Sequence, residues 1–292
     1  MKKLLYTLAA LAALVSCSES VSEFPEGQLR FQFSLPGTRA TSSAFETGDA
    51  VSLYAVAYNS GNRMPLQTGG NWLNNEKVTY DGSDWNPART LYWSEAACDF
   101  YAFYPFQPSI GSMEKYPFSV AVNQNSARTV SLLGGYEASD LMYACAENVS
   151  RGAGAVNLGF HHMMSKLVVC VQKGPQFEGD IPDDIVAHVY NTVTDCTVDW
   201  TKGSVEKNAF GAKNTLTMKK ISNERFEAVL VPQNIEKRTP LIELTMGGIS
   251  YLLEYSLSFR PGYVHTVTLT LNTSPDQEQI EISINPGVNN WN

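Results

Sequence analysis

The sequence predicts an all-β protein built from antiparallel sheets, and three observations carry this prediction. Apolar and polar residues alternate with period two in many short runs. These runs are rich in Val, Ile, Thr, Tyr and Phe, and Gly, Pro, Asn and Asp separate them. No stretch of about 12 residues or more carries the apolar stripe of an amphipathic helix. Short strands that must each bury one face favour β-sandwiches.

The first residues predict a secretory signal, which takes no part in the fold. Lys2 and Lys3 precede an uncharged run over residues 4–15. Because a helix needs roughly 20 residues to cross a bilayer, this run is too short to be a membrane span. A short basic head before a short apolar run is typical of a signal peptide.

The end of this run, Leu14-Val15-Ser16-Cys17, resembles the bacterial lipobox. In that motif a cysteine is acylated and becomes the mature N-terminus. We therefore expect residues 1–17 to be a lipoprotein signal peptide, with Cys17 lipidated. A single acyl chain binds membranes reversibly, so several chains on Cys17 would be needed for lasting anchorage. The alternative is an ordinary signal peptide in which the cysteine stands by chance.

Length and charge set limits on domain number and on partners. The 292 residues suffice for two domains of ordinary size, and 43% of them are hydrophobic. The formal net charge is −8, from 29 acidic and 21 basic residues without long charged runs. Binding to nucleic acid needs a basic surface, so we expect no nucleic-acid partner.

After the signal, the sequence predicts a tether and a first set of strands. Residues 18–27 are polar and rich in breakers, which indicates a flexible tether. Leu29, Phe31 and Phe33 alternate with polar residues and predict a short first strand. Pro105 suits the end of a strand because proline has no N–H for the ladder. The strands expected in this half cover 29–35, 51–57 and 100–104, and short helices are expected near 109–115 or 134–144.

A second set of strands follows and indicates an internal repeat. Residues 99–105 and 225–232 share one pattern, an apolar strand that ends at a proline. Two similar β domains in tandem would explain this pattern, with a boundary near Gly152-Ala153-Gly154. We therefore expect one domain over 18–153 and another over 154–292. The strands expected in the second half cover 167–171, 185–193, 226–231, 241–245, 249–257 and 264–271.

Four cysteines follow Cys17, and their spacing does not indicate a metal site. They form no CxxC pair, and no histidine lies at ligand spacing from them. In an exported protein they could form two disulfides, with three pairings. Each also stands beside apolar or strand-like sequence, where a free cysteine behaves as a small hydrophobic residue, and we favour this interpretation. The four are Cys98, Cys145, Cys170 and Cys196.

The sequence offers no set of residues that predicts catalysis, a bound metal or a cofactor. His161 and His162 are adjacent, and neighbours on a regular strand point to opposite faces, so they cannot share a metal. The sequence lacks HExxH, GxSxG and P-loop motifs. Asp183 and Asp184 lie in an Ile-Pro-Asp-Asp turn, and Asp140 is placed to cap a short turn. We therefore expect a protein that is not an enzyme.

Aromatic residues are concentrated in the first half and allow two interpretations. Exposed rings could stack on the faces of sugars, whereas rings on strands more often fill a core. We favour core packing and keep glycan stacking as the alternative. The residues concerned are Trp72, Trp85, Tyr92, Trp93, Tyr101, Phe103 and Tyr104.

Several segments, taken together and in order, resemble the fimbrillin family, the type V pilins and accessory subunits of Bacteroidales bacteria. Each segment alone is a weak signal, and the ordered set extends over nearly the whole mature chain. The segments are Thr38-Arg39-Ala40-Thr41 with 45–51, then 85–87 with 91–93 and 99–105, then 139–144, 156–167, and 228–233 with Pro261-Gly262-Tyr263 before 264–271.

The resemblance implies two tandem transthyretin-like antiparallel β-sandwich domains and a mode of assembly. In the family the lipoprotein reaches the outer membrane, and an Arg-specific protease cuts after the first strand. The lost strand leaves a groove that a strand from the next subunit fills. In this chain the matching positions are the strand over 29–35 and the Arg39-Ala40 bond. The alternative is that Arg39 is an ordinary surface arginine and that Cys17 remains the anchor.

The end of the chain is a candidate donor strand. Ile280, Ile282 and Ile284 alternate with polar residues, and Trp291 follows. Such a tail could place its apolar side chains in the groove of a neighbouring subunit. The alternative is that the tail pairs within its own domain.

These expectations combine into a non-enzymatic fimbrial subunit, either structural, accessory or tip. We expect it to assemble by donor-strand exchange and to act in adhesion. Its partners would be other fimbrial subunits, the outer membrane through the lipid, and a glycan or protein on a host or bacterial surface. We expect it at the outer membrane, surface-exposed, or in the fimbrium if it is processed. The alternatives are a glycan-binding outer-membrane lipoprotein and, third, a hydrolase on a β-sandwich.

Overall fold

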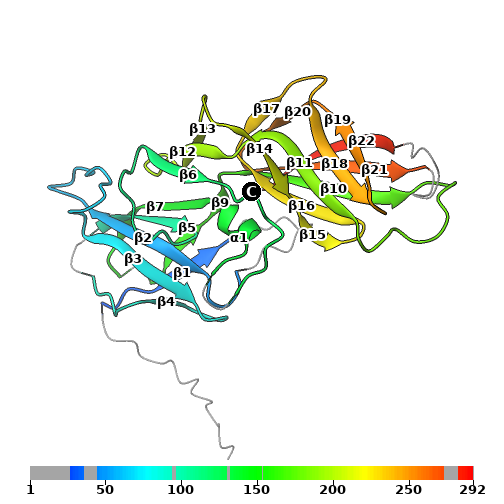
Figure 1. Ribbon diagram of the computed structural model, residues 1–292. Coiled ribbons are helices and arrows are strands. Elements are labelled where there is room, and N and C mark those ends of the chain that lie inside the picture. Colours follow the sequence, from blue (N-terminus) through cyan, green and yellow to red (C-terminus); the bar gives the residue numbers. More distant parts are fainter. Residues whose placement is uncertain are drawn as a thin grey trace, which may run out of the picture.

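The computed structural model describes residues 27–35, 45–93, 97–129, 132–152, 154–272 and 282–291. The described elements are strands apart from one short helix, α1 (Gly135–Ser139), so the predicted all-β class is confirmed. The helix expected near 134–144 is reduced to α1, and no helix forms over 109–115. No described helix has the length and apolar character needed to span a membrane. Figure 1 shows an elongated molecule with two groups of sheets.

The first half is built on a six-stranded antiparallel sheet in the order β4-β3-β2-β5-β7-β9. The alternation in β2 sends Val51 and Leu53 into one core and Tyr54 and Val56 into another. Beside this sheet, two strands form a small parallel sheet. The strands are β1 (Phe31–Ser34), β2 (Ala50–Ala57), β3 (Leu73–Tyr80), β4 (Trp85–Pro87), β5 (Ala97–Tyr104), β7 (Met142–Ser150), β8 (Val156–Gly159) and β9 (His161–His162).

The second half contains a five-stranded sheet, β15-β16-β10-β21-β22, and a four-stranded sheet, β14-β11-β18-β19. A two-stranded sheet, β17-β20, completes it. The strands are β10 (Ser165–Lys173), β11 (Val186–Val193), β14 (Lys213–Thr217), β15 (Lys219–Ser222), β16 (Arg225–Leu230), β17 (Gln233–Ile235), β18 (Pro240–Met246), β19 (Ile249–Glu254), β20 (Leu257–Phe259), β21 (Tyr263–Leu271) and β22 (Ile282–Asn290).

Two strand pairs are parallel, which corrects the expectation of purely antiparallel sheets. These pairs are β1 with β8 and β10 with β21. Parallel neighbours need a long connection between them, and both pairs join segments that lie far apart in the chain. Period-two alternation does not depend on strand direction, so the sequence pattern could not reveal them.

The two halves are joined more closely than the expected boundary near residue 153 implies. Both β8 and β9 follow that position, yet they pair with β1 and β7 of the first half. The strand pairing therefore places the passage into the second half after β9. A three-stranded sheet, β13-β12-β6, also connects the halves. It consists of β6 (Tyr116–Ser119), β12 (Asp195–Asp199) and β13 (Ser204–Lys207).

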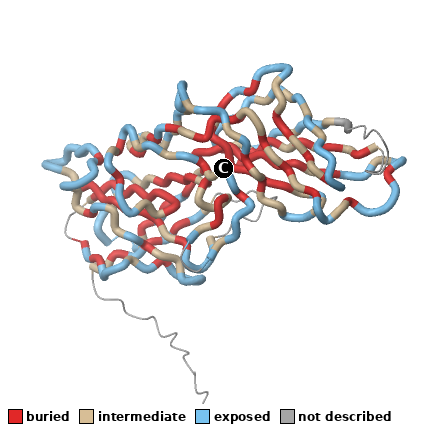
Figure 2. The backbone as a smooth tube through the Cα atoms, viewed as in Figure 1, coloured by how far each residue is buried: buried red, intermediate tan, exposed pale blue. Residues whose placement is uncertain are grey.

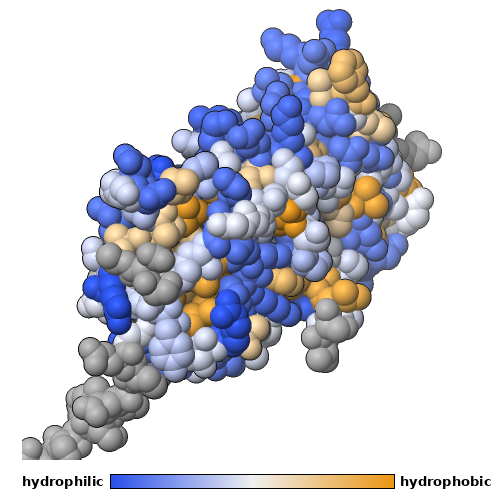
Figure 3. Space-filling view, turned by 90° about the vertical axis from the view of Figure 1, so that its left-hand side faces the viewer, coloured by the Kyte–Doolittle hydropathy of each residue, from blue (hydrophilic) through white to orange (hydrophobic). Residues whose placement is uncertain are grey.

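The hairpin of β12 and β13 carries the main apolar contact between the halves. Trp200, in the turn of this hairpin, is fully buried and stacks on Phe103 of β5 with ring centroids 4.4 Å apart. One continuous core cluster therefore contains residues of both halves. Figure 2 shows buried backbone continuing from one half into the other. Seen from the end of the first half, the surface is mainly hydrophilic, with separate apolar areas (Figure 3).

Candidate functional site

The first described strand is held by apolar side chains and by a single neighbouring strand. Phe31 and Phe33 of β1 are each 7% exposed. The ring of Phe33 lies 4.8 Å from Trp85 and 5.6 Å from Phe160, as measured between centroids. Burial of each such side chain contributes about 1.5–3 kcal/mol. Among the described strands, β8 alone pairs with β1.

A cavity of about 460 Å³ opens beside β1. Its lining includes the polar side chains Arg30 and Gln32 as well as Phe45 and Trp85. The strand is therefore short, packed on one face and open along part of its length. The sequence predicted this strand correctly, and the segment with Arg39 and Ala40 that follows it lies outside the described residues.

The C-terminal strand pairs within its own chain. β22 runs antiparallel to β21, from Ile282 opposite Leu271 to Asn290 opposite Tyr263. It is the edge strand of its sheet. Ile284 is half-buried against the large core, whereas Val288 is 45% exposed. In the single chain the intramolecular alternative for this tail is therefore realised. Ile280 lies outside the described residues, as does Cys17.

Trp291 ends the tail and lies between the two halves of the molecule. It is 2% exposed, and its ring stacks on His162 of β9 with centroids 3.7 Å apart and planes 9° apart. The backbone N–H of Trp291 donates to the carbonyl of Gly262 at 2.9 Å. The ammonium of Lys166 lies 5.6 Å from the ring centroid. We call His162, Lys166 and Gly262 the Trp291 site.

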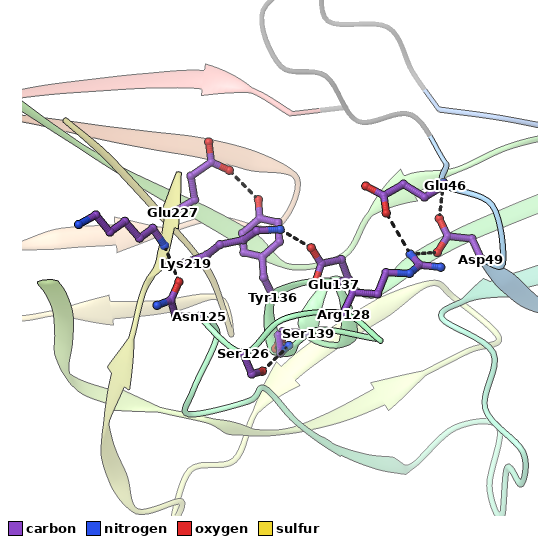
Figure 4. A network of polar contacts seen from close by, with 12 residues as sticks. Glu46, Asp49, Asn125, Ser126, Arg128, Tyr136, Glu137, Ser139, Lys219 and Glu227 are labelled. Carbon is purple, nitrogen blue, oxygen red and sulfur yellow. Dashed lines mark hydrogen bonds and ion pairs between the residues drawn. The ribbon is translucent and has the colours of Figure 1, made fainter. Parts of the chain in front are cut away.

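A cavity of about 400 Å³ adjoins the Trp291 site and is lined by charged residues from both halves. On the first-half side, Arg128 contacts Asp49 at 2.7 Å and Glu46 at 3.5 Å (Figure 4). Burial, reinforced by the charge of Asp49, raises the pKa of Tyr104 far above its usual value. The Tyr104 hydroxyl therefore stays protonated and donates to Asp49 at 3.2 Å.

On the second-half side, Glu227 is the centre of a buried charge cluster. Its carboxylate contacts Lys166 at 2.7 Å and Arg225 at 2.6 Å, and it accepts a hydrogen bond from Tyr136 at 3.0 Å. Burial would raise the pKa of Glu227, but Lys166 and Arg225 outweigh burial and lower it. Glu227 is thus an anion that pairs with the buried Lys166 and the partly exposed Arg225 rather than a group poised to transfer protons.

The short helix α1 belongs to the first half and contacts the second-half charge group. Glu137 of α1 pairs with Lys219 of β15, and the ring of Tyr136 lies 4.9 Å from the Lys219 ammonium (Figure 4). Asp140, the C-cap of α1, lies 2.8 Å from Nδ1 of His162. Asp140 therefore fixes the ring on which Trp291 stacks, a side-chain contact that differs from the predicted capping role.

His162 lines this cavity, whereas the other histidines are not among its lining residues. His161 and His162 are adjacent on β9, and His161 contacts the ring of Tyr143. Burial, together with Arg260, lowers the pKa of His265 to about 4. Within the described ranges, no group of three His, Cys, Asp or Glu residues could hold a metal ion.

Asp183, Asp184 and the four described cysteines have structural roles. Asp183 accepts a hydrogen bond from Asn223 at 2.6 Å, and Asp184 accepts from the N–H of Gly247 at 3.1 Å. Both carboxylates therefore stabilise turns. The four described cysteines form no disulfide, as favoured from the sequence. Cys98 and Cys196 are buried, and Cys145 and Cys170 are half-buried.

The aromatic residues of the first half mostly fill its core. Trp72 is half-buried and stacks on Trp93 with centroids 5.8 Å apart. Tyr92 is the exception, at 52% exposed. A platform of several exposed rings does not form among the residues of that set. The buried members are Trp85, Trp93, Tyr101, Phe103 and Tyr104.

Sequence reasoning missed the charged cavity, although two signals pointed to it. Lys166 interrupts an apolar run that continues through Val171, and Glu227 lies between Phe226 and Ala228. A charge inside a buried strand needs a partner, because an unpaired buried charge is strongly unfavourable. The partners come from distant segments, so the sequence alone could not identify them.

Comparisons with known proteins agree with this architecture. Residues 38–291 match the model of the fimbrillin-like family. A proposed cell adhesion protein from Bacteroides uniformis is 20% identical, with a TM-score of 0.67, covering 91% of this chain and all of the other. One from Bacteroides ovatus is 13% identical, with a TM-score of 0.68, covering 90% of this chain and 96% of the other.

A third similar structure is the tip fimbrial protein Mfa3 from Porphyromonas gingivalis, with a C-terminal truncation. It is 11% identical with a TM-score of 0.50, and the match covers 84% of this chain and 95% of the other. At these identities the likeness to solved structures shows the fold. Comparison with curated protein sequences gives no match.

Proposed function

The chain belongs to the fimbrillin-like family, and from this premise we propose that it is a fimbrial subunit that assembles by donor-strand exchange and takes part in adhesion. The proposal rests on the way in which β1 is held in the fold. It is a short strand, its phenylalanines are buried, and β8 is its one neighbour among the described strands. It also stands directly before the predicted cleavage at Arg39.

Loss of β1 would create a suitable acceptor. The edge of β8 would lose its hydrogen-bonding partner, and the sites of Phe31 and Phe33 against Trp85, Phe100 and Phe160 would be empty. Unpaired backbone groups beside an apolar slot favour addition of another strand. A strand with apolar residues at alternate positions satisfies both requirements at once.

The tail supports the donor role. β22 lies at a sheet edge, and the side chains of Asn285, Pro286, Val288, Asn289 and Asn290 are exposed. Pro286 has no N–H for the ladder. An edge strand with few buried side chains costs little to detach, so it can move from its own chain to another.

Delivery to the surface completes the proposal. Cys17 would carry the lipid that brings the chain to the outer membrane, and a cut after Arg39 would release the chain from that lipid together with β1. Replacing Cys17 with Ala should remove the precursor from the membrane fraction. Unchanged membrane retention would exclude the lipid anchor.

The processing step is tested by the N-terminus of the surface-exposed protein. We expect the assembled chain to begin at Ala40 and Arg39→Gln to block both cleavage and assembly. Arg151→Gln is the matched control, because Arg151 is an exposed arginine in a turn of the same half. Polymers built from chains that still carry residues 18–39 would contradict the proposal.

The donor role is tested by deleting residues 279–292. The truncated chain should stay folded, as measured by circular dichroism, and should fail to polymerise. Normal polymers from the truncated chain would refute the tail as donor strand. Glycan binding through exposed aromatic residues has less support, because Tyr92 is the sole strongly exposed ring of the first-half set considered above.

A further inference from the structure

We propose that Trp291 is a latch that keeps the C-terminal strand on its own chain, and that it must leave the Trp291 site before the strand can pass to a second copy. The proposal rests on the proposed donor function, because it concerns what restrains the donor. The contact itself is observed in the single chain and can be tested without assembly.

The tail is attached by two different kinds of contact. Along β22, backbone pairing with β21 holds residues whose side chains are largely exposed, and such pairing at an edge opens readily. At the end of the tail, Trp291 is buried and only 2% exposed. Among the tail residues whose burial is described, Trp291 is the one that is buried. The strength of attachment is therefore concentrated in a single residue.

The Trp291 site is assembled from both halves of the molecule. His162 belongs to β9 in the sheet of the first half, and Asp140 holds its ring from the end of α1. Gly262 and Lys166 belong to the second half, and Glu227 holds the Lys166 ammonium at 2.7 Å. Figure 1 places the C-terminus at the junction of the two halves. Withdrawal of Trp291 would therefore remove a bridge between the halves as well as free the tail.

The ring of Trp291 packs closely in its site, but its indole N–H is left without a hydrogen-bond partner. The stacked ring and the backbone hydrogen bond are favourable. The indole Nε1 is buried and has no hydrogen-bond partner. A buried donor without an acceptor lowers the stability of the docked state, because water satisfies that donor after release. This combination suits a contact that forms specifically and is later broken.

The latch also lies beside the described residues that flank the predicted cleavage site. Leu35 and Phe45, which precede and follow residues 36–44, line the same cavity as Trp291. The residues that flank the predicted cleavage site and the last described residue of the proposed donor strand thus line one cavity.

Hydrogen exchange of the unprocessed full chain tests the latch. Trp291→Ala should raise exchange of the β22 amides and their β21 partners by about tenfold, the factor expected for loss of one aromatic stacking contact. Val288→Ala is the matched control on the same strand, because Val288 is 45% exposed, and it should leave exchange unchanged. Trp291→Phe should restore most of the protection, because a phenyl ring can stack on His162.

A second variant keeps the test decisive if Trp291→Ala does not fold. His162→Ala removes the stacking partner and leaves the tail intact, so it should also raise exchange over 282–290. If Trp291→Ala is folded and its residues 282–290 exchange as slowly as in the wild type, the latch is refuted. If Trp291→Ala is unfolded, the same result in His162→Ala refutes it.

Failure of the donor proposal can be distinguished from failure of the latch by comparing hydrogen exchange with assembly. If Trp291→Ala frees the tail and speeds assembly of the processed chain, both proposals are supported. If the tail is freed while deletion of residues 279–292 leaves assembly normal, the latch stands and the donor proposal falls. If the tail remains protected, the latch falls whatever the rate of assembly.

Discussion

Glu227 shows at the residue scale how a buried charge is tolerated in this fold. Its side chain is 10% exposed and that of Lys166 is 5% exposed. Taking such charges out of water is costly, so the pair adds little stability by itself. Removal of the Glu227 carboxylate is costly, because Lys166 would then be buried without a counter-charge. Glu227 therefore fixes which segments meet at the cavity.

Replacement of this carboxylate gives a prediction for stability. Glu227→Gln should lower the free energy of unfolding by about 3–5 kcal/mol, because Lys166 is left buried without a counter-charge. Urea unfolding at neutral pH measures the change. Glu206→Gln is the control, because Glu206 is exposed on β13, and it should change stability by less than about 0.5 kcal/mol.

The same pair predicts a direction of pH dependence. The folded-state pKa of Glu227 is lowered from 4.5. A lowered carboxyl pKa contributes stability above the unfolded value, and this contribution is lost as the pH falls through the folded value. Wild-type stability should therefore fall below pH 4.5, and Glu227→Gln should show a weaker dependence there. Parallel curves for the two proteins would contradict this assignment.

At the scale of elements, β1 combines tight packing with limited hydrogen bonding. The side chains of Phe31 and Phe33 are buried in the first-half core, but the strand has four residues and one named partner. The apolar contacts can therefore be supplied by any strand that presents rings at the same spacing. This is the physical basis on which the acceptor groove is proposed.

A peptide that supplies β1 should restore the stability of a chain that lacks this strand. A chain that starts at Ala40 should unfold at a lower urea concentration than the full mature chain, because the apolar slot of β1 is empty. A peptide of residues 27–35 should restore stability when added, since it supplies the strand in trans. The same peptide with Ser in place of Phe31 and Phe33 should have no effect. Equal rescue by both peptides would show that the rings do not select the strand.

At the scale of the whole molecule, the β12–β13 hairpin makes the two halves share a core. Trp200 comes from the second half of the sequence and packs on Phe103 of the first. The charged cavity and Trp291 add further links between the halves. Such coupling favours unfolding of the halves in one transition, because the larger core is built from residues of both halves.

Trp200 therefore controls cooperativity as well as stability. Trp200→Ala should cost about 3–5 kcal/mol and should broaden or split the thermal transition. Phe210→Ala is the control, because Phe210 lies a few residues further on and is 98% exposed, and it should leave the transition unchanged. Calorimetry of both variants measures the effect. A single sharp transition at the wild-type temperature in Trp200→Ala would contradict the shared core.

Local patterns accounted for some of the strands, but not for others such as β3, β7 and β12. Alternation identified the strand containing Phe31 and Phe33, and it identified β2, whose successive residues face two cores. The first-half aromatic residues were expected in the core, and all of that set except Trp72 and Tyr92 are buried. The resemblance of ordered motifs identified the family that the match over residues 38–291 then showed. These conclusions needed only the side chains and their spacing.

Long-range contacts were beyond the reach of those patterns. The parallel pairing of β10 with β21, the docking of Trp200, and the meeting of Asp140, His162 and Trp291 all join distant residues. The sequence by itself determined strand content and class, because alternation is set by neighbouring residues on one strand. Only the tertiary structure decided how the halves join and where the tail docks, because those contacts depend on which distant surfaces fit together.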